Sequence, residues 1–463
     1  MAEFPTYEQL AALVAEQAAT IARLEERVAE LQRQLGRNSR NSSTPPSKDP
    51  LDAPIRPTRG KAGRRPGKQP GSPGSALRLV EDPDEVVEHR PDACGGCGSG
   101  LRRAADAGVV RRQVHDIPEV SARVVEHRLH RRRCACGHVT TATAPAGVNA
   151  PVCYGPNLRA LAVYLVVFQH VPVERAALLI ADVTGAKVST GWVSGAVAAT
   201  AEDLVDVEAL IKTLLVLAHV LHVDETSTSI AGKGWWLHVA CTERLTAYRL
   251  HPSRGRVAVN AFGILPDYTG IAVRDALSVY DGYPNAVHAL CGAHLARELA
   301  AAAETHPDHA WPAAALDALH GLNTAAHAAR AAGRTRIPTK TARRLRKEWK
   351  HAVLVGLAAN PRAEGRKQSK TRNLLERCRD REVEILRFAT DLTVPFTNNQ
   401  AERDLRPTKT QLKISGCHRS ETGANAWLRI RGYISTARKN DINVLDALRG
   451  AITGNPWKPL PST

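Results

Sequence analysis

Two acidic residues in this sequence directly follow apolar runs of strand length. The run LLVLAHVLHVDETSTS, Leu214 to Ser229, is nearly uninterrupted and predicts a central buried strand that stops on Asp224 and Glu225. A second short run, GIAVRD, closes on Asp275, with Asp281 of YDGYP as the rival position. Neighbouring strand ends of an α/β sheet can bring two acids together, and their hard oxygen ligands suit Mg²⁺. A strand that simply runs into a solvated turn is the plainer interpretation.

A third acid is expected at the start of a helix. In TNNQAERDLRP, residues 397–407, Thr397, Asn398 or Asn399 can cap a helix whose first turn presents Glu402. Two aspartates at strand ends and one glutamate on a helix make the ligand set of a two-metal phosphoryl-transfer site. The metals would be two Mg²⁺ ions, with Mn²⁺ as a substitute.

Four cysteines form two close pairs in the first third of the chain. Cys94 and Cys97 have two residues between them, Cys134 and Cys136 have one, and 36 residues separate the pairs. Four thiolates can enclose one structural Zn²⁺, and His130 or His138 could replace a sulfur. An alternating, strand-like segment, residues 109–133, is expected between the pairs. Free structural thiols are the alternative.

Cys291 and His294 form a further C-x-x-H pair after Asp275. The spacing permits metal ligation, but only two ligands are in sight. A packing or hydrogen-bonding role near the acids is therefore favoured.

Basic residues dominate the charge of the 463-residue chain, with 63 Lys and Arg against 46 Asp and Glu, a formal charge of +17. This excess favours a polyanionic partner, nucleic acid first, although a basic protein without such a partner would look the same. Two runs are candidate DNA contacts, and each could instead be a solvated helix face. They are Arg343, Arg344 and Lys347 in one helix, and Arg403, Arg406 and Lys409 beside Glu402.

The elements that must position these residues read as an α/β domain. Two strand-like segments, residues 234–243 and 245–253, follow the first acid and predict a three-stranded meander, with a helix over residues 256–262 after it. Ahead of the sheet, residues 155–200 read as helices with a break at Gly185. This outline fits a helix-turn-helix or an ordinary helical hairpin.

The N-terminal region predicts a helix with a heptad seam. Apolar residues recur four and three apart from Leu10 to Leu35, mainly β-branched at a and Leu at d, with Gln17 as a polar exception. This pattern favours a parallel two-stranded coiled coil, and an amphipathic helix packed on its own protein is the alternative. The Pro-, Gly-, Ser- and Arg-rich residues 37–75 predict a disordered basic linker.

Composition bounds the remaining possibilities. With 43% apolar residues the chain can bury real cores. It shows no secretory h-region and no apolar run of membrane-spanning length, and nine cysteines are an odd number. A cytoplasmic protein with reduced thiols and no membrane partner is expected.

The ordered set of motifs resembles one family. The chain is similar to a DDE transposase of the insertion sequence sixty-six family in its ordered motifs. These are Asp224-Glu-Thr, Asp275 and Asn399-Gln-Ala-Glu402-Arg-Asp, together with NSRNSSTPPS, the Cys module and LCGAHLAREL. The resemblance covers essentially the whole chain. It implies a ribonuclease-H-like catalytic domain, a helical insertion among the 126 residues between Asp275 and Glu402, and a DDE triad of Asp224, Asp275 and Glu402.

The resemblance also implies an activity, namely metal-dependent cleavage and strand transfer of double-stranded DNA at the inverted-repeat ends of a mobile element. It further implies a homodimer or higher oligomer that forms through the coiled coil. Accessory transposition proteins and association with the bacterial nucleoid are also expected. The alternatives are a nuclease of the same fold without strand transfer and a catalytically silent DNA-binding regulator.

The expected division of the chain follows from these features. It comprises a coiled-coil helix (1–36), a basic linker (37–75), a zinc-binding Cys module (76–150), a helical DNA-binding region (151–212), a catalytic core (213–303 and 391–440) with a helical insertion (304–390), and a C-terminal helix and tail (441–463).

Overall fold

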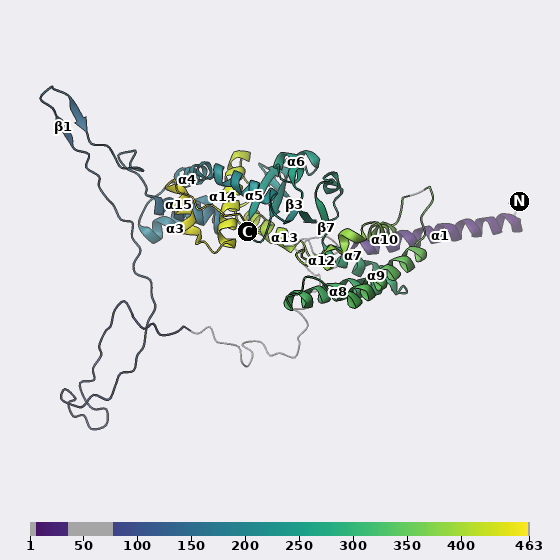
Figure 1. Ribbon diagram of the computed structural model, residues 1–463, viewed down its shortest axis with the longest axis horizontal. Helices are drawn as coiled ribbons and strands as arrows, with labels where there is room; N and C mark the ends of the chain where they lie inside the picture. The colour runs from purple at the N-terminus through teal and green to yellow at the C-terminus, as the bar shows by residue number, and fades with distance from the viewer. Residues whose placement is uncertain (1–5, 36–76, 366, 462–463) are drawn as a thin grey trace, which may run out of the picture. The chain divides into compact units, whose positions relative to one another are not determined.

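The computed structural model describes residues 6–35, 77–365 and 367–461, shown in Figure 1. The chain divides into two compact units, residues 1–51 with 123–463 and residues 52–122, which are described separately. The predicted linker, residues 37–75, lies outside the described residues.

A five-stranded mixed sheet forms the centre of the larger unit. The strands are β3 (Val220–Ile230), β4 (Lys233–Cys241), β5 (Thr246–His251), β6 (Ile271–Arg274) and β7 (Val287–Leu290), in the spatial order β5-β4-β3-β6-β7. The first three pair antiparallel, which confirms the predicted meander, whereas β6 lies parallel to both β3 and β7. The expectation of an α/β fold is confirmed.

The predicted limits of the central strand are wrong at both ends. Leu214 belongs to helix α5 (Val205–Val216), where it is buried with Leu215, so the apolar run is a helix end joined to a strand. The strand does not stop at Asp224 but continues to Ile230, because Thr226 to Ile230 pair with β4 in a hairpin. What ends near Asp224 is the parallel pairing with β6, whose last partners are His222 and Val273.

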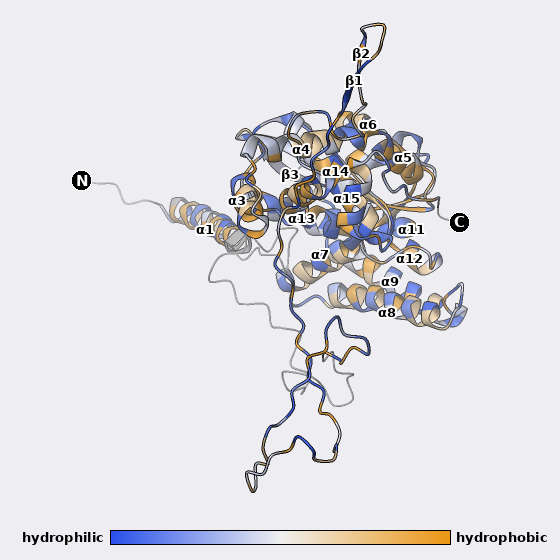
Figure 2. Cartoon of the chain, turned by 90° about the vertical axis from the view of Figure 1, so that its left-hand side faces the viewer, coloured by the Kyte–Doolittle hydropathy of each residue, from blue (hydrophilic) through white to orange (hydrophobic). Residues whose placement is uncertain are grey.

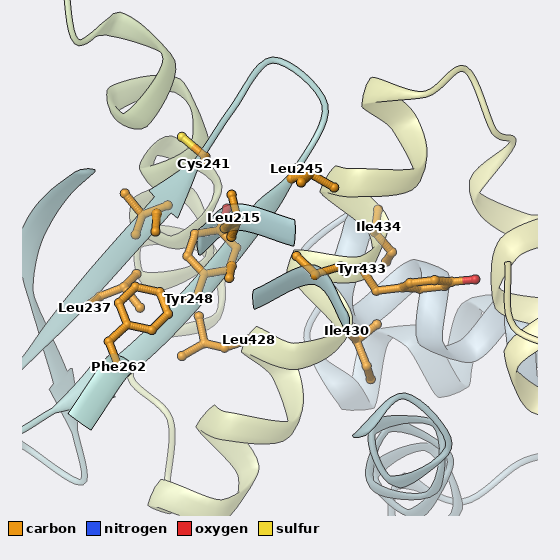
Figure 3. Packing of buried hydrophobic residues seen from close by; sticks show 14 of the residues in the cluster. Leu215, Leu237, Cys241, Leu245, Tyr248, Phe262, Leu428, Ile430, Tyr433 and Ile434 are labelled. Atoms are coloured by element: carbon orange, nitrogen blue, oxygen red, sulfur yellow. The ribbon is translucent and has the colours of Figure 1, made fainter. Parts of the chain in front are cut away.

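The helices before and after this sheet in the sequence pack against one another, and some of them also against its strands; Figure 1 shows α3 and α4 near α14 and α15. These elements are α2 (Pro156–Val163), a π-helix (Tyr164–Phe168), α3 (Val173–Thr184), α4 (Thr190–Asp203), α6 (Arg256–Phe262), α13 (Asn399–Ser415), α14 (Glu421–Lys439) and α15 (Val444–Ile452). The predicted Gly185 break is confirmed, since Gly185 ends α3 at φ 73°. Residues of the sheet, α6 and α14 gather into one apolar core (Figure 3). Gly432 of α14 lets that helix approach β5 closely, because an added Cβ would lie 3.1 Å from the Thr246 carbonyl oxygen.

A second core forms among the helices between β7 and α13. They are α7 (Gly292–Thr305), α8 (Trp311–Ala331), α9 (Thr339–Ala359), α10 (Lys370–Asp380), α11 (Glu382–Ile385) and α12 (Arg387–Thr390). Leu319 of α8, Trp349 of α9 and Leu375 of α10 are fully buried in it. In Figure 2, α8 and α9 carry hydrophilic and hydrophobic residues in turn, as expected of helices with one buried face.

The Cys-containing region has little regular structure. Among the described residues 77–130 there is no strand, so the predicted strand-like segment 109–133 is wrong except for β1 (Arg131–Arg133), which pairs with β2 (Val139–Thr141). Val114 and Val124 are more than nine-tenths exposed, so the alternating residues have no buried face to occupy. Alternation marks a strand only where one face is covered.

Helix α1 (Tyr7–Leu35) covers most of the predicted heptad region. Its seam residues are exposed, with Val14 63% and Leu24 57% accessible. The coiled coil remains a prediction. None of the helices in the described parts of the chain has the length and apolar character that a membrane span requires.

Candidate active site

Asp224 lies in β3 among other carboxylates. Its Oδ1 accepts a hydrogen bond from the Glu225 backbone N–H at 2.9 Å. Burial raises the pKa of Asp224 to about 8, and the negative charges of Glu225, Asp275 and Glu402 act in the same direction. Asp224 therefore lies close enough to Asp275 and Glu402 to be affected by the charge of each.

Asp275 directly follows β6, the strand beside β3. Its Oδ1 accepts from the Leu277 N–H at 2.9 Å, which fixes the turn. The fully buried Arg274 donates from Nη1 to the carbonyls of Asp275 (3.1 Å) and Leu277 (3.3 Å). The loop that carries Asp275 is thus held by hydrogen bonds from an arginine of the preceding strand.

Asp281, the rival for the second acid, has other partners. Its Oδ1 accepts from Arg274 Nη2 at 2.5 Å and from Arg381 Nη2 at 2.9 Å. Arg381 also pairs with Glu384 of α11, so Asp281 joins the sheet to the inserted helices. Two arginines already neutralise this carboxylate, which favours Asp275 as the acid available to a ligand.

Glu402 lies in the first turn of α13, as predicted. Its Oε1 is 3.9 Å from Nε2 of His294 on α7. Burial lowers the pKa of His294, and Arg297 adds to the effect, so the imidazole is neutral at neutral pH. The buried Nδ1 of His294 has no protein partner among the described residues.

The cap of α13 involves two of the three predicted residues. Asn398 occupies the N-cap position without a side-chain capping bond, and the hydroxyl of its neighbour Thr397 accepts from the Asn399 N–H at 3.4 Å. The Asn398 side chain is instead buried against β3, where Oδ1 accepts from His222 Nδ1 (2.9 Å) and Nδ2 donates to the Val223 carbonyl (2.8 Å). Its backbone N–H donates to Cys291 Sγ at 3.2 Å. The cap residue of the Glu402 helix is therefore bound to the strand of Asp224, and Cys291 has the hydrogen-bonding role expected of it.

The far side of α13 is fixed by a second buried residue. Asp404 accepts from Lys439 Nζ at 2.6 Å and from Thr246 Oγ1 at 3.2 Å. The Tyr248 hydroxyl donates to the Asp404 carbonyl at 2.6 Å. Contacts to β3, β5 and α14 together leave Glu402 little freedom to move with its helix.

The inserted helices hold the segment that leads into α13. Arg330 of α8 donates to the carbonyls of Leu392 (2.7 Å) and Val394 (2.8 Å). The N–H of Gly292, the first residue of α7, donates to the Phe396 carbonyl at 2.8 Å. Only glycine fits there, because an added Cβ would lie 2.1 Å from the Phe396 ring.

Sequence reasoning missed a second charged group at this site. Glu225 has a side chain only 1% exposed, and its Oε1 accepts from Arg254 Nε (2.9 Å) and Nη2 (2.6 Å). The Tyr280 hydroxyl donates to Oε2. The one sequence signal for Glu225 is its position beside Asp224. No spacing in the sequence relates Arg254 or Tyr280 to Glu225.

The acid cluster suits a divalent cation by charge and by donor type. Burial raises the pKa of Asp224 and the neighbouring carboxylates add to the shift, so a cation among them would remove that repulsion. In the part of the chain that the structure describes, no three His, Cys, Asp or Glu side chains already form a metal-holding group. Holding an ion would therefore require the three side chains to converge further.

The two cysteine pairs belong to different compact units, so each is described alone. Hydrogen bonds from Ser99 lower the pKa of Cys97, with a further contribution from Cys94. Hydrogen bonds from Cys136 lower the pKa of Cys134, at the turn of the β1–β2 hairpin. Both shifts favour the thiolate, which is the form that binds zinc.

The predicted DNA-contacting residues are all exposed: Arg403, Arg406 and Lys409 on α13, and Arg343, Arg344 and Lys347 on α9. Arg344 pairs with Glu348 at 2.7 Å, whereas the α13 residues have no ion pair among the described residues. The α13 group lies within two turns of Glu402.

Comparison with known families gives three matches. The model described as transposase IS66 family matches residues 151–426, more than half of the chain. The zinc-finger binding domain of transposase IS66 matches residues 91–137, a range that contains all four paired cysteines. A family of unknown function, DUF6444, matches residues 3–78. No curated protein matches the chain.

Proposed function

Because the chain belongs to the transposase IS66 family, we propose that it cuts and joins DNA at the inverted-repeat ends of an insertion sequence, using Asp224, Asp275 and Glu402 as a DDE triad. The observation that carries this proposal is the effect of the Asp275 and Glu402 charges on the pKa of Asp224. These residues belong to β3, the end of β6 and α13, three elements that are distant in the sequence.

The sheet supports a ribonuclease-H-like core. An antiparallel meander, β3 to β5, continues through its first strand into two parallel strands, β6 and β7. One acid on β3, a second directly after the adjacent strand β6 and a third on a helix packed against β3 are the ligand types that such chemistry needs. The helices α8 to α12 would be the insertion that the family resemblance implies.

Each acid has a part in the proposed reaction. Asp224, Asp275 and Glu402 would together hold two Mg²⁺ ions, with Asp224 as the ligand common to both, Asp275 for one and Glu402 for the other, and Mn²⁺ would be a substitute. Such ions, when bound, activate the attacking oxygen and stabilise the leaving oxygen. Water attacks the phosphorus of a phosphodiester at the element end and the P–O3′ bond breaks, which leaves a 3′-hydroxyl on the element and a 5′-phosphate on the flank. That 3′-hydroxyl then attacks a phosphorus of target DNA, forms a new phosphodiester and displaces a target 3′-hydroxyl. No covalent protein–DNA intermediate forms.

Basic groups are assigned to the DNA backbone. Arg403, Arg406 and Lys409 would hold phosphates next to Glu402, and Arg343, Arg344 and Lys347 would contact the duplex farther from it. A structural Zn²⁺ held by Cys94, Cys97, Cys134 and Cys136 would organise the N-terminal Cys module for end binding.

The assembly and location follow from the same proposal. A homodimer or higher oligomer forms through α1, accessory proteins assist transposition, and the protein works in the cytoplasm on the bacterial nucleoid. The helices of residues 151–212 take part in DNA binding.

Substitution of the triad tests this function. Asp224→Asn, Asp275→Asn and Glu402→Gln should each reduce cleavage of an inverted-repeat duplex at least about 1,000-fold with Mg²⁺, because removing a member of a unit that works together removes most of its rate. Asp446→Asn, which changes an exposed aspartate of α15, is the matched control and should leave cleavage unchanged.

Pre-cleaved ends separate the remaining possibilities. Joining of such ends to a target plasmid supports a transposase, whereas cleavage without joining indicates a nuclease. Binding of the duplex with neither reaction, in the wild type, indicates a regulator and refutes the proposal.

A further inference from the structure

We propose that Arg254, held by Glu225 and Trp236, binds a backbone phosphate of the DNA strand that enters the acid cluster. This inference rests on the proposed function and adds a substrate contact that neither the sequence motifs nor the family matches assign. It starts from the charge of the site, because the carboxylates of Asp275 and Glu402 repel a polyanion.

The position of Arg254 places its positive charge near Glu225 and Asp275. The residue lies in the short loop between β5 and α6. The neighbouring negative charges of Glu225 and Asp275 both favour its charged form, and Asp275 acts on Glu225 as well. The Arg254 guanidinium is therefore a cation at the edge of the triad.

The orientation of Arg254 is fixed from two sides. Nε and Nη2 both donate to Oε1 of Glu225, and Cζ lies 4.9 Å from the centre of the Trp236 ring. The loop itself is closed by the Ser253 N–H, which donates to His251 Nδ1 at 2.9 Å. A guanidinium held in this way loses little conformational freedom when it binds a ligand.

One edge of the guanidinium remains available. The Arg254 side chain is 42% exposed, whereas Glu225 beneath it is 1% exposed. Nη1 has no partner among the described residues, and guanidinium N–H groups are suited to phosphate oxygens. Trp236 is partly exposed beside it and offers an aromatic face to a base.

Other cations near the acids are less suited to this role. Arg377 also senses Asp275, but it is paired with Glu298. Arg274 is fully buried and is used by Asp281 and the Asp275 loop. Arg254 alone among these three is half-exposed, oriented and only partly engaged.

The alternative is a purely structural role, in which Arg254 only neutralises the buried Glu225. A double variant distinguishes this structural role from phosphate binding. Arg254→Gln alone leaves a buried carboxylate with one partner fewer, so it should lower stability whichever role is true. Glu225→Gln removes that charge, and Glu225→Gln/Arg254→Gln should then unfold at the denaturant midpoint of Glu225→Gln. Function can be compared between these two proteins at equal stability.

The test uses full-length protein and a duplex carrying the inverted repeat with its flank. The double variant should cleave about 10- to 100-fold more slowly than Glu225→Gln, the loss expected for one hydrogen bond to a charged group. The slope of log affinity against log salt should fall by about 0.9 in magnitude, the value for one phosphate contact. Arg254→Lys should keep most of the slope but not the cleavage rate.

Arg449→Gln is the matched control, because Arg449 is a comparably exposed arginine paired with Asp446 on α15. It should change neither quantity. Equal salt slopes and equal cleavage rates for the double variant and Glu225→Gln would overturn the assignment. The salt slope requires no cleavage, so it tests Arg254 even if the proposed reaction itself fails.

Discussion

Asp224 carries a proton at neutral pH in the metal-free protein, because its pKa is raised to about 8. The same carboxyl in an unfolded chain has a pKa of about 3.9. Between these values the folded state keeps a proton that the unfolded state has released. Stability contributed by this group is therefore lost as the pH rises from about 4 to about 8.

Asp224→Asn should flatten this dependence. In EDTA, the urea concentration at the unfolding midpoint of the wild type should decrease as the pH is raised from 5 to 8. The midpoint of the variant should decrease less over the same range. Part of the decline should remain, since burial also raises the pKa of Glu225. Parallel curves for the two proteins would show that Asp224 does not titrate in this range.

Residues of the candidate site were predictable where their chemistry follows a local pattern. Asp275 follows an apolar strand and Glu402 opens a helix, and both patterns can be read within ten residues of sequence. Arg254 and Tyr280 could not be predicted, because they meet Glu225 only through the packing of separate loops. The same holds for Arg274, whose burial beneath Asp275 has no counterpart in an ordinary strand pattern.

At the level of elements, α13 is the one whose placement decides the geometry of the acids. Its N-cap residue Asn398 is bound to His222 and Val223, the two residues before Asp224. A shift of this helix along the sheet would move Glu402 away from Asp224.

Asn398→Ala should therefore impair cleavage more than DNA binding. It leaves the Val223 carbonyl and His222 without their buried partner, which should lower the unfolding free energy by about 1–3 kcal/mol. Cleavage should fall about 10- to 100-fold, while the affinity for an inverted-repeat duplex stays within about twofold, since Asn398 is buried away from solvent.

Asn399→Ala is the control for that experiment. Asn399 is the exposed neighbour in the same helix turn, and its side chain has no hydrogen bond among the described residues. If both variants behave alike, the contacts of Asn398 with β3 are not what positions Glu402.

The apolar pattern predicted the presence of these elements better than their limits. Leu214 to Val216 end a helix and Val220 begins a strand, yet the two form one apolar run because both are buried on the same core. Hairpin pairing with β4 then extends β3 beyond Asp224, and pairing depends on a partner that the run itself does not specify.

For the whole molecule, the apolar seam of α1 is a feature that the described residues of the chain leave exposed. Val14, Ile21, Leu24 and Val28 are each more than half exposed. Heptad spacing with these residue types fits a second copy of the same helix.

Deletion of residues 1–35 should therefore lower the oligomeric state. The full chain should sediment as a dimer or larger species whose fraction rises with concentration, and the shortened chain should sediment as a monomer over the same range. Leu24→Ser should have the effect of the deletion, whereas Glu25→Ser, on the same turn, should not. A shortened chain that still associates would place the contact elsewhere.

The separation of the three acids along the chain also affects how the protein is made. A ribosome adds residues in order, and segments fold as they emerge. Asp224 and Asp275 are synthesised first, and 126 further residues must follow before Glu402 exists. Under the proposed function, a nascent or prematurely terminated polypeptide that lacks α13 has no Glu402 and cannot complete the triad. Synthesis itself would thereby delay the proposed cleavage until residues 399–415 have been made.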